Sequence, residues 1–539
     1  MKRFMVLSAL SAFAACVPNE AWVDEADEAN DTVDVTGQKF SSAVGTLMNF
    51  QFEATLWTQG TVSSFGARSA IDEQMLFTIG HLNADKAVGR LDRIKISNVR
   101  TVAEGTGTRI TYTVLLPVSW GSQTSLPSTY AFTLPRAVDA SSIEAFTEKY
   151  KAKCIDLGAH DVDSGSIWYY YRPRASGCAL TESDVVRFTA TASKSTENTT
   201  GKYPEYTKVW EDGALRVVAI FGKYEDGATT SSDAGIAGFN AFIRAMKTEL
   251  RAFSPTTVPA VVPDSPGVSA PDVTFTATLP NGKQVVVTAL LVDNVSTAGA
   301  AFDRRYEGLS TRADLIVYNG HAGLGQNVRA LSRKGRFVAG QYAIFFMNGC
   351  DTFAYVDGSL AQDRARLNPD DPTGTKYMEI VTNGMPAFFS SMPTATVALM
   401  RGLMKTDAPM TYQQIFQGID RNQVVMVTGE EDNVFTPGNV TPSWAGLDAT
   451  GTVAKSQEQR YQTPVLPAGS YRFTLSGTGD ADLYVRDGAA PTTTTYSCRP
   501  YQNGSAEQCQ VNLTAPTTIH VMVRGYAASS TYTLVGRAQ

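Results

Sequence analysis

Two short, continuous apolar runs constrain the fold of this chain more than any other feature of its sequence. Residues 342–347 (YAIFFM) are apolar throughout, and residues 314–318 (DLIVY) are apolar after the first position. Strands that are apolar on both faces are typical of a parallel sheet covered by helices on both sides. Residues 328–334 suit a short crossover helix, and such a unit places its two strands parallel and adjacent. The sequence therefore predicts a central three-layer α/β domain with a mainly parallel sheet.

A reactive side chain follows each of these predicted strands. His321 lies in the glycine-rich loop 319–325, and Cys350 follows Asn348 and Gly349. The carboxyl ends of parallel strands form the edge of an open sheet at which ligands bind. A cysteine is nucleophilic as its thiolate, a nearby imidazole can take its proton, and glycines let backbone N–H groups approach an oxyanion. The pattern predicts an acyl-transfer site with Cys350 as nucleophile and His321 as general base.

The cysteines have alternative assignments, and motifs for other catalytic chemistries are missing from the sequence. Cys154 and Cys178 are expected to form a disulfide in an exported protein. A lone Cys350 is alternatively a buried residue that acts as a small apolar side chain. The sequence contains no His-Glu-x-x-His, Gly-x-Ser-x-Gly or phosphate-binding GxxxxGK[ST] motif, which weakens zinc, serine-hydrolase and nucleotide hypotheses.

The N-terminus has the features of an export signal. Residues 1–15 combine an early Lys-Arg pair with an apolar run, which is typical of a secretory signal peptide. Residues 13–16 (FAAC) resemble the lipobox of bacterial lipoproteins, which implies a lipid on Cys16; the alternative is ordinary cleavage beside it. Residues 16–40 form an acidic tether, because they contain seven acidic residues between positions 20 and 34 and no basic one there. We expect an exported bacterial protein, either lipid-anchored to the cell envelope or extracellular.

Composition shifts divide the rest of the chain. The proline-rich stretch 254–271 reads as a linker, and 436–452 as a weaker one. Residues 41–253 mix strand-like alternation with a helical period at 234–250, which predicts an α+β domain of unknown role. The central domain then spans 272–435. A net charge of −6 and a pI of about 5.5 argue against a nucleic-acid partner.

The segment 453–539 alternates short strands with Gly, Ser and Thr turns, which predicts a small β-sandwich. Its motifs LPAGSYRFTLSGTGDADLYVRDG and VMVRGYAASSTYTL resemble the bacterial pre-peptidase C-terminal domain, a module found on secreted peptidases. The resemblance implies a disulfide between Cys498 and Cys509 and places Asp480 and Asp482 where some relatives bind calcium. A second candidate calcium loop contains Asp370 and Asp371, and solvated turns are the alternative for both pairs.

The unit that carries His321 and Cys350 resembles the caspase–hemoglobinase (clan CD) cysteine peptidases. Their mark is an apolar strand ending in His-Gly, then a second apolar strand ending in a small residue and Cys. The resemblance covers about residues 285–432, and in it the apolar residues 385–390 look like the strand that follows the His–Cys pair. It implies an oxyanion hole of backbone N–H groups from Cys350, Ala322 and Gly323. It also implies a specificity pocket, for which the acidic candidates are Asp351, Glu430, Glu431 and Asp432.

These features together predict an exported cysteine endopeptidase that cleaves protein or peptide substrates through Cys350 and His321. No cofactor is expected to be required, and a structural calcium ion is the alternative to solvated turns at the two aspartate pairs. The alternative is a non-catalytic surface lipoprotein, an inactive relative of the same fold that binds a protein or a polysaccharide.

Overall fold

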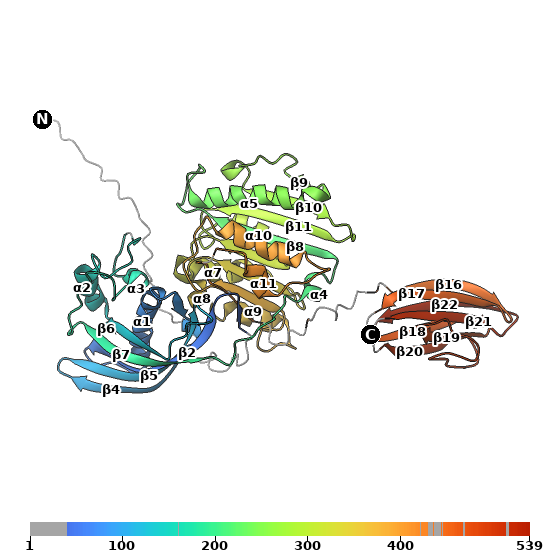
Figure 1. Cartoon of the computed structure of the whole chain (residues 1–539), viewed down its shortest axis with the longest axis horizontal. Helices are drawn as coiled ribbons and strands as arrows, with labels where there is room; N and C mark the ends of the chain where they lie inside the picture. Colours follow the sequence, from blue (N-terminus) through green and yellow to red (C-terminus); the bar gives the residue numbers. More distant parts are fainter. Residues whose placement is uncertain are drawn as a thin grey trace. The chain divides into compact units, whose positions relative to one another are not determined.

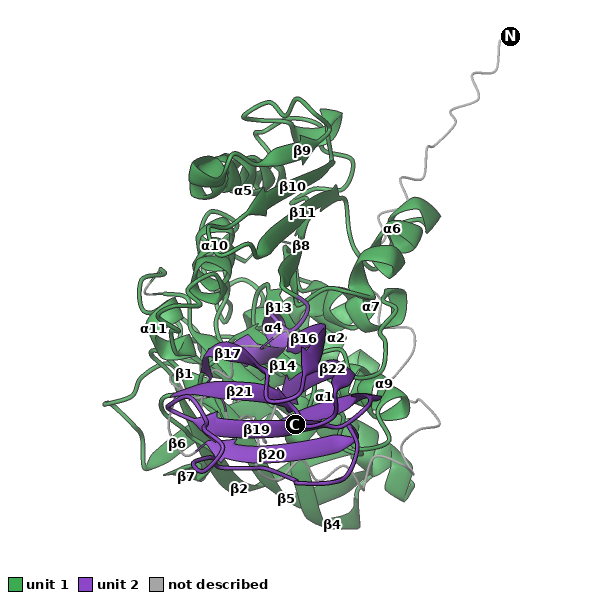
Figure 2. Ribbon diagram, turned by 90° about the vertical axis from the view of Figure 1, so that its right-hand side faces the viewer, with its two compact units in different colours: residues 1–204, 213–433 green, residues 205–212, 434–539 purple. Residues whose placement is uncertain are grey.

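The computed structural model describes residues 40–539 apart from 160, 421, 430–434, 436–443, 445, 467–468, 514–516 and 539. The chain forms two compact units, residues 1–204 with 213–433, and residues 205–212 with 434–539 (Figure 2). The expected signal peptide, Cys16 and nearly all of the expected acidic tether lie outside the described residues. None of the described helices is long and apolar enough to cross a membrane.

A nine-stranded sheet forms the centre of the larger unit (Figure 1). Its five middle strands are parallel, and the strands at its two ends are antiparallel. In spatial order the strands are β1 (Ser41–Ser42), β15 (Val425–Gly429), β14 (Met378–Asn383), β13 (Ala343–Asn348), β12 (Leu315–Asn319), β8 (Ala214–Gly222), β11 (Gln284–Val292), β10 (Asp272–Thr278) and β9 (Thr256–Val258).

Helices cover both faces of this sheet, which explains why its middle strands are apolar on both sides. Every residue of β12, β13 and β14 is buried. In Figure 2 the helices α5 (Ala234–Leu250) and α10 (Met392–Leu403) lie on one face, and α6 (Ala300–Ser310) and α7 (Gln326–Lys334) on the other. The remaining helices of this part are α8 (Thr352–Tyr355), α9 (Ser359–Leu367) and α11 (Tyr412–Phe416).

The structure divides the chain differently from the predicted boundaries. Strand β8 and helix α5 lie before residue 254, yet β8 pairs with β11 and β12 inside the central sheet. The expected linker 254–271 contains β9, which pairs with β10. The predicted strand at 385–390 is a loop. The strand in this region is β14, which ends at Asn383, two residues before the predicted strand begins. The expected α+β domain 41–253 and the expected domain 272–435 therefore belong to one unit.

The first part of the chain packs the helix α1 (Ser64–Asn83) onto a six-stranded antiparallel sheet. The strands are β3 (Ala87–Gly89), β5 (Gly107–Trp120), β2 (Thr46–Gln59), β7 (Val185–Lys194), β6 (Thr129–Pro135) and β4 (Lys95–Glu104), and the other helices are α2 (Ala140–Tyr150) and α3 (Ile167–Tyr170).

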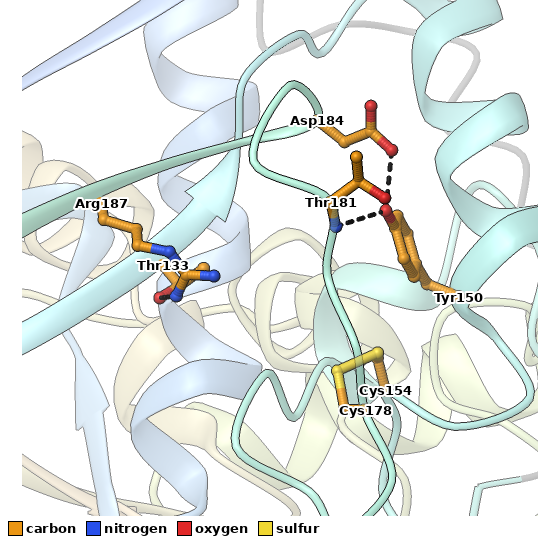
Figure 3. The surroundings of a disulfide bond; sticks show 7 residues. All are labelled: Thr133, Tyr150, Cys154, Cys178, Thr181, Asp184 and Arg187. Atoms are coloured by element: carbon orange, nitrogen blue, oxygen red, sulfur yellow. Dashed lines mark hydrogen bonds between the residues drawn. A yellow bond between two sulfur atoms is a disulfide. The ribbon is translucent and has the colours of Figure 1, made fainter.

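The Cys154–Cys178 disulfide joins the end of α2 to the chain before β7. Beside it, the Tyr150 hydroxyl donates to Asp184 over 2.7 Å and accepts from the Thr181 N–H over 3.0 Å (Figure 3). These hydrogen bonds hold the long connection between α2 and β7 against the domain. The disulfide stabilises the folded state as well, because the closed loop has less conformational freedom in the unfolded chain.

The smaller unit is an all-β sandwich, as its alternating sequence predicts. One sheet contains β16 (Leu447–Ala454), β22 (Ser529–Ala538), β18 (Gly469–Thr478) and β20 (Glu507–Leu513). The other contains β17 (Glu458–Leu466), β21 (Thr517–Gly525) and β19 (Ala481–Asp487). Its residues Cys498 and Cys509 form the second disulfide, and a short helix α4 (Tyr206–Val209) also belongs to this unit.

Candidate functional site

Three neighbouring parallel strands end in the same dipeptide at one edge of the central sheet. β12 ends in Asn319-Gly320, β13 in Asn348-Gly349 and β14 in Asn383-Gly384. Asn319 and Asn348 are direct register partners, and β13 pairs in parallel with β14. His321 follows the first dipeptide and Cys350 the second, so both loops leave the same edge of the sheet.

The three asparagines form a buried hydrogen-bond network, and each is at most 1% exposed. The Asn348 amide donates to Asn319 over 2.8 Å, and the Asn383 amide donates to Asn348 over 3.1 Å. Gln423, just before β15, donates to Asn348 and Asn383, and Thr396 of α10 donates to Asn319. Because a buried amide is costly unless it is hydrogen-bonded, this network fixes the relative positions of the strand ends.

These network residues are absent from the sequence-based list of site residues. The available signal was the repetition of Asn-Gly after three apolar strands.

His321 lies between two aromatic rings. Its ring centroid is 5.0 Å from that of Tyr224, which follows β8, and 5.0 Å from that of Phe389. Its Nε2 lies 3.1 Å from the Tyr224 carbonyl oxygen. Burial lowers the pKa of His321 below its ordinary value, and nearby carboxylates oppose that effect. The imidazole is therefore neutral near pH 7.

Neutral His321 has one defined tautomer. A carbonyl oxygen only accepts hydrogen bonds, so Nε2 carries the proton and Nδ1 keeps its lone pair. The ring can therefore accept a proton at Nδ1.

Cys350 is held as a thiol. Its Sγ donates to the Ala387 carbonyl oxygen over 3.5 Å. Burial, and secondly the neighbouring Asp351 carboxylate, raise the pKa of Cys350 to about 11. No hydrogen bond between the thiol and the His321 imidazole occurs among the described residues. The predicted thiolate–imidazole pair is therefore not formed in this structure.

The Asp351 carboxylate is buried against the first part of the chain. It is 0% exposed and accepts a hydrogen bond from the Asn83 amide of α1 over 3.1 Å. Burial raises its pKa to about 6. The structure thus places this candidate specificity residue inside the protein, while Glu430, Glu431 and Asp432 lie outside the described residues.

The backbone donors named by the sequence analysis lie close together. A Cβ built on Gly349 would be 3.3 Å from the Ala322 nitrogen, so the loops after β12 and β13 touch. Ala322 has helical backbone angles and Gly323 has a φ of +59°. Successive right- and left-handed residues point their N–H groups into a concavity that suits an anion or a carbonyl oxygen.

The candidate calcium ligands bind protein groups instead. Asp370 accepts from Lys376 and Tyr377, and Asp371 accepts from Thr373 and two backbone N–H groups. In the sandwich, Asp482 forms a buried ion pair with Arg499 over 2.7 Å, and Asp480 accepts from the Gly504 N–H. The carboxylates already have partners, so these loops do not support a structural calcium ion.

Comparison with known proteins finds bacterial proteases that share part of this chain. A zinc metalloprotease of Helicobacter pylori is 48% identical over 82 residues, which cover 15% of this chain and 32% of that protein. The hemagglutinin/proteinase of Vibrio cholerae is 48% identical over 82 residues, 15% of this chain and 14% of that protein. The alkaline serine exoprotease A of Vibrio alginolyticus is 38% identical over 86 residues, 15% of this chain and 16% of that protein. The chain thus spans a third or less of each, and the matched part is the C-terminal segment.

These relatives overturn two parts of the prediction, cysteine-type catalysis and the absence of a required cofactor. Two relatives are named as metalloproteases, the zinc metalloprotease of Helicobacter pylori and a virulence metalloprotease of Vibrio anguillarum. Neither cysteine-type catalysis nor the caspase–hemoglobinase assignment is supported by them. The protonated Cys350 thiol agrees with this correction, because the thiol form is a weak nucleophile.

The described residues do not provide a zinc site to match those names. His81 accepts from the Thr133 N–H, His321 contacts the Tyr224 carbonyl oxygen, and His520 contacts Thr518. Across the described part of the chain, no group of three His, Cys, Asp or Glu side chains is placed to hold a metal ion. The donor set that zinc requires is therefore not assembled by these residues.

The sandwich itself matches a known family. The model of the bacterial pre-peptidase C-terminal domain matches residues 466–525, which run from the end of β17 to the end of β21. The solved C-terminal fragment vEP C-ter 100 is 38% identical and covers 19% of this chain and 95% of that fragment, with a TM-score of 0.15. The match of residues 466–525 to the family model identifies the C-terminal sandwich, with its Cys498–Cys509 disulfide, as a bacterial pre-peptidase C-terminal domain.

Proposed function

We propose that this chain is an exported peptidase whose larger unit carries the active site and whose pre-peptidase C-terminal domain is an accessory module. The match of residues 466–525 to that domain carries the proposal. Proteases named as zinc-type and as serine-type share the segment. The module therefore supports peptide-bond hydrolysis without setting the catalytic class.

The edge of the sheet after β12 and β13 is the proposed substrate site. The N–H groups of Cys350, Ala322 and Gly323 would polarise the carbonyl oxygen of the scissile peptide. His321 would act as the general base, because its Nδ1 keeps a lone pair near pH 7. A water molecule attacks the carbonyl carbon while Nδ1 takes its proton, the C–N bond breaks, and that proton passes to the leaving amine.

Export and attachment complete the proposal. The apolar residues 1–15 support export, and the sequence FAAC supports a lipid on Cys16 followed by an acidic tether. The substrate is a protein or peptide outside the cell.

Proteolysis by the full mature chain tests the function. We expect cleavage of denatured casein, measured by mass spectrometry of the released peptides, and its loss in His321→Ala. His520→Ala is the matched control, because His520 lies in the accessory sandwich. A chelator followed by zinc addition separates metal-dependent from metal-independent cleavage. No cleavage under any of these conditions would contradict the proposal.

A further inference from the structure

We propose that Asn383, Asn327 and Tyr318 are positioning residues that aim two backbone N–H groups, those of Cys350 and Ala322, at one acceptor oxygen of the substrate. The inference rests on the proposed peptidase function and extends it. It assigns roles to three buried side chains that lie beside the proposed site.

The first peptide plane joins Gly349 to Cys350. The Asn383 amide donates to the Gly349 carbonyl oxygen over 3.0 Å. A trans peptide is planar, with its C=O and N–H on opposite sides, so fixing the oxygen also fixes the direction of the Cys350 N–H. That N–H donates to no other described residue.

The second plane joins His321 to Ala322 and is held in the same way. The Tyr318 hydroxyl donates to the His321 carbonyl oxygen over 2.8 Å, and the Asn327 amide donates to it over 2.9 Å. The N–H on the opposite side of this plane belongs to Ala322, which is only 5% exposed. This N–H has no acceptor within the described chain.

The two planes meet at one place. Gly349 approaches the Ala322 nitrogen so closely that a Cβ on Gly349 would lie 3.3 Å from it. N–H groups without an acceptor are rare in the interior of folded proteins, and here one lies on the buried Ala322 and one on the half-buried Cys350. The pair points to an acceptor supplied from outside the chain. A peptide carbonyl or a product carboxylate supplies an oxygen that accepts two such hydrogen bonds.

The positioning side chains are themselves constrained. Asn383 is 0% exposed and also donates to Asn348, and Asn327 is 1% exposed and accepts from the Ser296 N–H. Neither amide is free to turn without breaking a second hydrogen bond. The donors are therefore oriented before substrate binds, which is the arrangement that favours stabilisation of a developing oxyanion.

Selective labelling of the full mature chain with ¹⁵N-cysteine tests the inference. Cys350→Ser assigns the Cys350 amide resonance, and the probe is an acetylated tripeptide with a free carboxylate, compared with its C-terminal amide. We expect the resonance to move on titration of the wild type with the carboxylate. The response is lost in Asn383→Asp, whose carboxylate cannot donate to Gly349, and kept in Thr147→Val, a control that loses a buried hydrogen bond in α2, outside the network.

Kinetics provide the second readout. Asn383→Asp is expected to lower kcat at least about tenfold with KM within about twofold, because the lost interaction strengthens in the transition state. If Asn383→Asp does not fold, Tyr318→Phe is the milder variant, with kcat lowered about threefold because Asn327 still holds the plane.

The outcomes separate the inference from the function. An unmoved wild-type resonance in a chain that cleaves casein overturns the inference and leaves the function standing. A resonance that moves in a chain that cleaves nothing overturns the proposed function and leaves the arrangement of the two N–H groups standing. Equal loss of kcat in Thr147→Val and Asn383→Asp would mean a general structural effect and would also overturn the inference.

Discussion

The protonation of Cys350 leads to a quantitative prediction about its reactivity. With a pKa of about 11, roughly 3 in 10,000 thiols are ionised at pH 7.5, compared with about one in ten for a free cysteine. Because the thiolate is the reactive form, alkylation of Cys350 in the folded chain should be about 300-fold slower than in the unfolded chain. The rate should continue to rise with pH above 9.

Iodoacetamide labelling followed by mass spectrometry of the Cys350 peptide measures this rate between pH 6 and 10. Cys350 is the one described cysteine without a disulfide partner, so the signal is unambiguous without reduction. Asp351→Asn should lower the midpoint, since the Asp351 carboxylate is the second cause of the raised pKa. A rate that reaches a plateau near neutral pH would refute this reasoning and would restore Cys350 as a candidate nucleophile.

Three further predictions concern stability, measured by urea unfolding. Burial lowers the pKa of His81 to about 3, below its unfolded value of about 6.5, so stability present above pH 6.5 is lost as the pH falls towards 3; His81→Gln should flatten that dependence. Lys202→Met should cost about 3–5 kcal/mol, because it leaves the 0% exposed Glu379 carboxylate without the amine 2.8 Å away, and adding Glu379→Met should recover most of the loss. Gly349→Ala should cost about 1–3 kcal/mol, because its Cβ would lie 2.7 Å from a backbone oxygen of the adjoining loop. The control Gly308→Ala, in a helix with open space around it, should stabilise the protein by up to about 1 kcal/mol; equal losses in both glycine variants would contradict the steric argument.

The apolar pattern predicted strands β12 and β13 of the central sheet, because burial on both faces of a strand requires an unbroken apolar run. Both strands are buried along their whole length, and helix α5 follows the helical period of residues 234–250. Strand β14 was missed because Glu379 interrupts its apolar run, and only the ion pair with Lys202, far away in the sequence, makes that charge tolerable in the core. The apolar segment 385–390 was taken for the strand, although it forms the loop whose Ala387 oxygen accepts from the thiol.

The state of Cys350 could not be predicted from the residues around it in the sequence. Its raised pKa comes from burial and from Asp351, and Asp351 is in turn buried against Asn83 of α1. That contact joins residues 268 positions apart. The local sequence therefore does not reveal the environment that decides whether the thiol ionises, and the nucleophile assignment rested on local sequence alone.

The repeated Asn-Gly dipeptide shows what additional signal such an edge contains. An asparagine at the last register position of a strand reaches the asparagine of a neighbour only if the two strands are parallel and end at the same level, as Asn319 and Asn348 do. The following glycine then lets the adjoining loops approach closely, as Gly349 does beside the Ala322 nitrogen. Three strands that each end in Asn-Gly thus indicate a shared edge. The geometry of the site therefore depends on all three strand ends. Because Asn348 is hydrogen-bonded to both Asn319 and Asn383, a change at Asn348 should disturb the loops of His321 and Cys350 together.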